Sequence, residues 1–351
     1  MSDKNLARRT AVEITFDGVD ITKSIRQYFK SLTYTDSEEE EADDLQIRLQ
    51  DSGGIWMEKW LNEAIEAAGL EIQAVIVRQN WRGDGADEPL DCGVFELDSV
   101  ECSGPPSEIN VKATSLPFNA RVRQTKKSKA WESYFLQGIA NEIASKNSMV
   151  CMFLSDKNPF YERVEQYQSS DIAFLQQLCH DAGCSLKATN KMLVLFDQAD
   201  YENKAAVRTI RRGDGSYGSY HLRTSTADTQ YQSCRVYYND PTSGKCIQAT
   251  AYCEDYDSTR KDNQRLEICH KVSTVGEAKA LAEKHLRLHN KFEKIVQFTG
   301  PGDPLLLAGV TVELQGWGAW DGRYMIRTAK HTVNASGYIT TIDARRVLEG
   351  Y

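Results

Sequence analysis

Two histidines of this chain have the spacing of metal ligands on a helix, since His285 and His289 lie four residues apart. That spacing would place both imidazoles on one helical face, as in zinc sites of the H-E-x-x-H type. No acidic residue lies between them to act as a general base, and His285 falls on an apolar row between Leu281 and Leu288. The pattern therefore favours one packed histidine beside one surface histidine over a metal site.

The nine cysteines are odd in number, and no two of them have C-x-x-C spacing. Cys179 and Cys184 flank His180 across the end of a predicted helix, which is poor spacing for zinc ligands. Cys179 and His180 could imitate a nucleophile and its base, but adjacent helical residues point in different directions. We interpret the cysteines as small buried side chains and free thiols.

Several known catalytic and nucleotide-binding motifs are absent from this sequence. Neither G-x-S-x-G, H-E-x-x-H nor a Walker A sequence occurs among the 351 residues. The β-α-β alternation of a dinucleotide-binding enzyme is also lacking. The sequence thus predicts a protein that is not an enzyme and has no catalytic residue, cofactor or metal.

An acidic run, DSEEEEADD over residues 36–44, is the densest charge in the sequence. A calcium loop of the EF-hand type would alternate its ligands around a central glycine, and this run has neither feature. Because the run lies between two predicted strands, we interpret it as a solvated acidic turn.

Net charge and hydropathy limit the classes of function that this chain could have. The net charge of −8 argues against a duplex nucleic-acid binder unless its cations gather in one patch. The best basic run, RVRQTKKSK over residues 121–129, is interpreted as a solvated linker. The longest apolar run, residues 305–310, is too short for a membrane span, and the N-terminus lacks the apolar region of a secretory signal. We expect a soluble protein made in the cytoplasm.

The elements that must position these residues change type along the chain. Residues 11–115 alternate with a period of two, which predicts at least five strands separated by glycine-rich turns, with one short amphipathic piece at 55–67. The strands are expected at residues 10–16, 45–49, 71–77, 93–100 and 109–113.

Residues 131–200 switch to helical spacing. A first helix is predicted around residues 135–144, and a second begins at Ser170 and stops at Gly183. A hairpin follows, with strands at 184–188 and 192–196. This segment reads as a small α+β module.

The rest of the chain returns to strands with one helix. Thr274 and Glu277 form a capping box that predicts a helix start. Strands are expected at residues 295–298, 310–314, 323–333 and 338–347, the last two joined by a hairpin turn. The fold class is therefore α+β, predominantly β, divided into residues 1–120, 121–205 and 206–351.

Four stretches together resemble a known family, the phage late control protein D and related baseplate hub proteins of contractile tails and tail-like bacteriocins. They are SLTYTDSEEEEADDLQIRLQD (31–51), CGVFELDSVECSGPPSEINVKATS (92–115), QYQSSDIAFLQQLCHDAGCSLKATNKMLVLFD (166–197) and GWGAWDGRYMIRTAKHTVNASGYITTIDARRVLEGY (316–351). Their order and coverage of nearly the whole chain carry the resemblance.

The resemblance implies two tube-type β-barrel domains that flank the α+β insert. Three copies would form a ring that adapts a sixfold tail tube to a threefold central spike. The implied partners are the spike, tail tube, baseplate wedge and tape measure proteins, with DNA only as transiting cargo and no membrane binding by this chain alone. The implied location is the tail baseplate of a phage, prophage or bacteriocin particle, assembled in the bacterial host cytoplasm.

The same resemblance gives the acidic run an electrostatic role, because a conduit for DNA should not bind it. The residues concerned are expected at the bore or the rim of the ring: Glu38, Glu39, Glu40, Glu41, Asp43 and Asp44. Two alternatives remain open, a hub of a related injection or secretion system and a hub-associated peptidoglycan hydrolase. A secretion-system hub is expected to carry a C-terminal needle, and a hydrolase is expected to carry a further catalytic domain. This sequence ends at Tyr351, directly after the last predicted strand.

Overall fold

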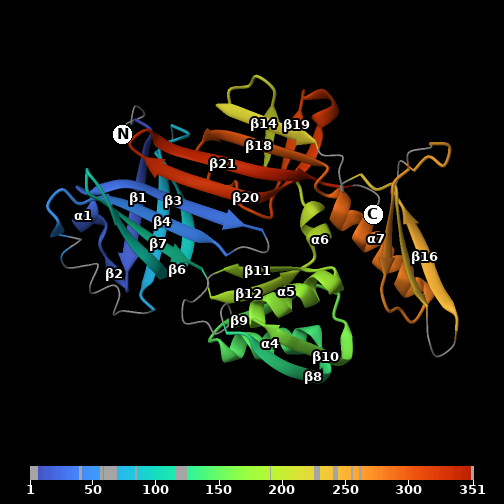
Figure 1. Ribbon diagram of the computed structural model, residues 1–351. Coiled ribbons are helices and arrows are strands. Elements are labelled where there is room, and N and C mark those ends of the chain that lie inside the picture. The colour runs from blue at the N-terminus through green and yellow to red at the C-terminus, as the bar shows by residue number, and fades with distance from the viewer. Residues whose placement is uncertain are drawn as a thin grey trace.

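The computed structural model of the protein (Figure 1) consists mainly of antiparallel sheet with a few helices. It describes residues 7–38, 42–55, 58, 69–83, 85–115, 125–189, 191–224, 230–239, 244–253, 256–260 and 263–348. The prediction of a predominantly β fold is confirmed. None of the helices in these ranges combines the length and apolar character needed to cross a bilayer.

The first lobe is a run of antiparallel strands in the order β3-β4-β7-β6-β5-β1-β2. Alternate side chains of these strands, among them Leu32, Ile47, Ile76 and Phe95, meet in one core. The elements are β1 (Arg9–Phe16), β2 (Val19–Asp20), α1 (Thr22–Ile25), β3 (Phe29–Ser37), β4 (Asp44–Gln50), β5 (Glu71–Gln79), β6 (Asp87–Ser103) and β7 (Glu108–Thr114).

The second lobe continues the same sheet. Strand β20 pairs with β21 along one edge, and along its other edge with β19 and then with β3 of the first lobe. A second core forms around Val296, Tyr324 and Ile342. The elements are β13 (Arg208–Arg211), β14 (Ser219–Thr224), β18 (Lys294–Pro301), β19 (Thr311–Gln315), β20 (Gly322–Asn334) and β21 (Gly337–Arg346).

The two lobes are therefore joined by strand pairing as well as by chain connections. Val333 and Tyr338, at the turn between β20 and β21, are buried in the core of the first lobe. His331 lies in the same region, fully buried and stacked on Tyr34, with one ring nitrogen 2.7 Å from the hydroxyl of Tyr338. This hairpin holds the lobes together.

The insert hangs below the lobes in Figure 1 and connects to them through α6 (Gln198–Glu202). It packs two helices on a three-stranded sheet in the order β11-β12-β9, with a separate β8–β10 pair. Its elements are β8 (Lys127–Phe135), α4 (Leu136–Lys146), β9 (Val150–Leu154), β10 (Phe160–Ser169), α5 (Asp171–Ala182), β11 (Ser185–Thr189) and β12 (Met192–Phe196).

A fourth unit, at the right of Figure 1, lies within the range expected for the second barrel. Strands β15 (Ser233–Asn239), β16 (Cys246–Tyr252) and β17 (Arg265–Cys269) form their own sheet, which α7 (Val275–Asn290) covers. Its core of Cys234, Val236, Ala278, Ala282 and Leu286 is separate from the others. The sequence analysis predicted the helix but did not separate this unit from the second lobe.

The local signals for helix ends hold in the structure. Ser170 caps α5, and Gly183 ends it in the left-handed region (φ +81°), while Thr274 accepts a hydrogen bond from the Glu277 amide at the start of α7. The basic run is not simply a linker, since Lys127 and Lys129 belong to β8 and pair with carboxylates of the insert. Residues 121–124 and most of the predicted piece at 55–67 lie outside the described residues.

Candidate functional site

The most distinctive site is a buried ionic cluster where the first lobe, α6, α7 and β21 meet. We call it the junction cluster. Its members lie far apart in the sequence but are brought together by the sheet pairing and by the short α6 connection: Glu38, Gln198, Glu202, Arg287, Lys291 and Arg345.

Arg345 is the centre of the junction cluster. Its guanidinium, only 1% exposed, lies 2.6 Å from Oε1 of Glu202 and 3.4 Å from Oε1 of Glu38. Both carboxylates are themselves buried. A buried charge is tolerated only when an opposite charge and hydrogen bonds compensate it, so Arg345 links three parts of the chain through one side chain.

Helix α7 contributes the other two cations. Arg287 pairs with Glu202, and the ammonium of Lys291 donates to the side-chain oxygen of Gln198. The amide nitrogen of Gln198 donates in turn to Glu38 at 3.1 Å. The neutral amide of Gln198 thus connects a carboxylate of the first lobe to a cation of α7.

A second buried ion group lies beside the junction cluster and ties β11 of the insert to the first lobe. Lys187 pairs with Asp36 and lies 3.7 Å from Asp43. Burial raises the pKa of Asp43 to about 6, because desolvation outweighs the attraction of Lys187. Burial alone would lower the pKa of Lys187, but Asp36 and Asp43 outweigh it and the net shift is upward.

The acidic residues named from the sequence are divided by the structure. Glu38 and Asp43 are buried inside the chain and have the partners just described. A side-chain oxygen of Asp44 accepts a hydrogen bond from Gln46 at 2.8 Å. Glu39, Glu40 and Glu41 lie outside the described residues. The position of this turn at the bore or rim of an assembly stays a prediction.

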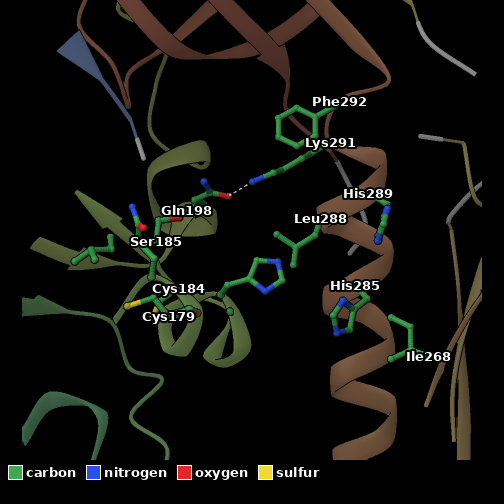
Figure 2. Close-up of a pocket in the computed structure, with 14 residues that line it drawn as sticks. Cys179, Cys184, Ser185, Gln198, Ile268, His285, Leu288, His289, Lys291 and Phe292 are labelled. Carbon is green, nitrogen blue, oxygen red and sulfur yellow. Dashed lines mark hydrogen bonds between the residues drawn. The ribbon is translucent and has the colours of Figure 1, made fainter. Parts of the chain in front are cut away.

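A cleft of about 470 Å³ separates α5 and β11 of the insert from α7 (Figure 2). The residues that line it include Cys179, His180, Cys184, His285 and His289. The ring centres of His180 and His285 are 6.2 Å apart, and the Cys179 side chain is only 1% exposed. Cys184 follows the Gly183 turn, and its amide bonds the carbonyl of Cys179, which closes the end of α5.

The environment of the Cys179 thiol and the His285 imidazole does not favour nucleophilic catalysis by this pair. A hydrogen bond to Cys184 and burial both raise the pKa of the Cys179 thiol, which keeps it protonated. Burial lowers the pKa of His285 to about 4, so its imidazole is neutral. Within the described ranges, no three side chains of the metal-ligating types gather around one point.

A G-x-G-x-x-G sequence, which the sequence analysis missed, occurs at Gly213–Gly218. It forms the turn between β13 and β14, so a strand follows it instead of a helix. A dinucleotide site needs a strand, this loop and then a helix whose N-terminus faces the pyrophosphate. The motif therefore lacks its functional context here.

Sequence reasoning missed most of the junction cluster. Glu202, Arg287 and Arg345 carry no local motif, and each reads as an ordinary surface charge in its element. Their meeting depends on tertiary contacts over 85 residues or more, such as that of Arg287 with Glu202. What the arrangement can do is structural, since it locks the insert, α7 and both lobes into one body.

Comparison with known proteins identifies the family of this chain. The family model described as "Phage tail baseplate hub (GPD)" matches residues 96–337. A "Probable baseplate hub protein" of Escherichia phage 186 is 25% identical over 245 residues, which is 68% of this chain and 59% of the relative. The chain thus spans less than two thirds of that relative's length.

Solved structures share the fold. A tail protein from Neisseria meningitidis MC58 superposes with a TM-score of 0.71 at 12% identity, over 96% of this chain and 97% of the other. A component of the Escherichia coli type VI secretion system gives a TM-score of 0.56 at 12% identity, over 96% and 78%. Because the family model matches more than half of the chain, from within β6 to the β20–β21 turn and including the whole insert, this chain belongs to the phage tail baseplate hub (GPD) family.

Proposed function

We propose that this chain is the structural hub of a contractile-tail baseplate, forming a trimeric ring that adapts the sixfold tail tube to the threefold central spike. The observation that carries the proposal is the family match, which runs from β6 of the first lobe to the β20–β21 turn of the second. The first lobe (residues 1–120) and the second (206–351) would each supply one tube-type barrel domain, with 121–205 as the insert.

The sheet pairing supports this role. Because β20 joins β3, two lobes with separate cores lie side by side within one chain. Three such chains present six lobes, which is the number that a sixfold tube requires. The junction cluster would keep the two lobes of one chain at a fixed angle while neighbouring chains pack against them.

The insert is proposed to face outward, toward baseplate wedge components. Large apolar side chains are unusually exposed on it, a feature typical of interaction surfaces: Phe135, Val150, Met152, Leu154, Phe160 and Tyr167. The spike and tail tube proteins would bind the two faces of the ring, with the tape measure protein and then DNA within the bore. Assembly would take place in the host cytoplasm and the product would be the particle's tail baseplate.

A hub of a secretion system is the second candidate, favoured by the fold shared with the type VI component. Catalysis is not part of the proposal, because the relatives that match are hub proteins and the Cys179 and Cys184 thiols of the cleft in Figure 2 are buried. Purified chain should release no product from peptidoglycan above background. Turnover that disappears in Cys179→Ala or His285→Ala would contradict this.

The test of the hub role is the stoichiometry of a reconstituted tail tip. The chain, its cognate spike and its tube protein are co-expressed, and the complex is weighed by native mass spectrometry and imaged by electron microscopy. We expect three copies in a ring with a bore not lined mainly by Lys and Arg. A copy number other than three contradicts the ring. Tail-tip complexes that form only in cells with a working secretion system would favour the second candidate.

A further inference from the structure

A second cleft, of about 750 Å³, lies between the end of α7 and the C-terminal strands of the second lobe. We call it the basic cleft. Besides the exposed Arg260, three cations from three strands line it: Lys294 at the start of β18, Arg323 near the start of β20 and Arg346 at the end of β21. All three are half-buried. The cleft belongs to neither the junction cluster nor the cleft of Figure 2.

The three cations are held by backbone carbonyls. Lys294 and Arg346 both donate to the carbonyl of Ala319, at 3.1 and 3.5 Å, and Arg323 donates to the carbonyl of Glu202 at 3.1 Å. Among the residues that the structure describes, no carboxylate lies within 4.0 Å of any of them. These contacts orient the cations and leave their charge uncompensated.

The buried cations of the junction cluster and of β11 have carboxylate partners, whereas the buried ammonium of Lys284 has no hydrogen-bond partner among the described residues. Lys187, Arg287 and Arg345 each contact at least one buried carboxylate. Removing a cation from bulk water costs free energy that an opposite charge normally offsets. Three shielded cations in one cleft, all without such a partner, are the arrangement of a site that receives an anion from outside.

We propose that the basic cleft binds an acidic peptide segment of another protein, with carboxylates of that segment seated on Lys294, Arg323 and Arg346. The inference goes beyond the hub role, since it names a surface and the chemistry of its occupant. The amide side chains of Gln230, Gln232 and Asn290 also line the cleft, though Asn290 is already bonded to the backbone of Tyr231. Gln230 Nε2 already donates to Glu293 and Gln232 Oε1 accepts from the Cys253 thiol, so it is Gln230 Oε1 and Gln232 Nε2 that can meet the peptide groups of an extended segment.

A polypeptide fits these observations better than a nucleic acid. Duplex or single-stranded nucleic acid is held by long basic tracks, and this chain carries a net charge of −8. The cleft contains its own acid as well, Glu293, whose carboxylate accepts from Gln230 at 2.9 Å. The Glu293 carboxylate would repel the evenly spaced phosphates of a nucleic acid, whereas a peptide segment can seat its carboxylates on the three cations and place a peptide group beside Glu293.

The test measures binding of a fluorescein-labelled octaglutamate peptide to the full chain by anisotropy at low ionic strength. We expect saturable binding that weakens about tenfold for each cation removed in Lys294→Gln and Arg346→Gln, the loss for a charge-assisted hydrogen bond. The matched control is Arg223→Gln with Lys330→Gln, which removes two exposed charges of the same sheet, on β14 and β20. It should change the affinity less than about twofold.

A covalent readout locates the peptide. Carbodiimide joins a glutamate carboxyl of the peptide to a lysine amine as an amide, with release of the urea, and mass spectrometry should find the bond at Lys294. Cross-links spread evenly over exposed lysines would overturn the proposal, as would equal losses in the two double variants. Tighter binding of an oligothymidylate than of octaglutamate would overturn the peptide assignment. These outcomes do not depend on ring formation, so failure here is distinguishable from failure of the hub role.

Discussion

Arg345 and Arg346 are neighbours at the end of β21, and their surroundings are opposite. Side chains of adjacent strand residues point to opposite faces, so Arg345 enters the junction cluster and Arg346 the basic cleft. Arg345 is 1% exposed and contacts two glutamates. Arg346 is half-buried, and its contact is a carbonyl at 3.5 Å.

The difference separates two uses of charge within one chain. Charges of the junction cluster are matched internally, and they hold parts of the fold together. Charges of the basic cleft are matched by no described carboxylate, so they contribute little to the fold and are available to a partner. Substitution of the two neighbours should therefore give effects on stability that differ in size and even in sign.

The largest expected effect is that of Arg345→Met. Removing the guanidinium leaves the buried carboxylates of Glu38 and Glu202 short of a partner, which typically costs about 3–5 kcal/mol. Urea denaturation followed by circular dichroism measures this loss. Arg346→Met is the matched control, one residue along the same strand, and should change the free energy of unfolding by less than about 1 kcal/mol. Equal losses in both variants would remove the distinction.

The second effect is a pH dependence at Asp43. The folded-state pKa of about 6 is above the ordinary value of 3.8, so the folded chain retains a proton that the unfolded chain has lost between these pH values. Its contribution to stability therefore falls as the pH rises from about 4 to 6. His331 acts in the opposite direction, because burial lowers its pKa to about 4 and its stabilisation is lost as the pH falls from 6.5.

Asp43→Asn removes the titration of the carboxyl but keeps a hydrogen bond, since the amide oxygen of the asparagine can still accept from the backbone amide of Ser37. We expect the variant to gain stability relative to the natural chain between pH 4 and 6.5, by up to about 3 kcal/mol. Unfolding curves at several pH values measure the difference. Parallel stability curves for the two proteins would show that Asp43 is not the titrating group.

An intermediate effect is expected at Gln198, the neutral link of the junction cluster. Gln198→Leu keeps the volume but removes the hydrogen bonds to Glu38 and Lys291, with an expected loss of about 1–2 kcal/mol. The control is Gln177→Leu on the exposed face of α5, where Gln177 donates to Asp181. Its loss should stay below about 0.5 kcal/mol, and a larger loss there would argue against a special role for burial.

The sequence predicted what local patterns determine. Period-two alternation located β1, β4, β5 and β7, and the caps at Ser170 and Thr274 located two helix starts. It did not predict that the acidic turn is partly buried, because Glu38 meets Arg345 across 307 residues of chain. No periodicity or spacing encodes such a pair. The separate core of β15–β17 and α7 was missed for the same reason, as its boundaries depend on which strands pair.

The smallest expected effect concerns salt. Lys294, Arg323 and Arg346 line one cleft with no described carboxylate within 4.0 Å of any of them, so they repel one another over distances that dissolved ions screen. The double variant Lys294→Gln with Arg346→Gln should leave the free energy of unfolding within about 0.5 kcal/mol of the natural chain.

Raising the salt from about 0.05 to 0.5 M should stabilise the natural chain more than this variant, because only the natural chain has that repulsion to screen. Differential scanning calorimetry in a series of sodium chloride concentrations measures both slopes. A loss above about 1 kcal/mol in the variant would mean that the bonds to the Ala319 carbonyl outweigh the repulsion, and the basic cleft would then resemble the junction cluster in holding the fold together.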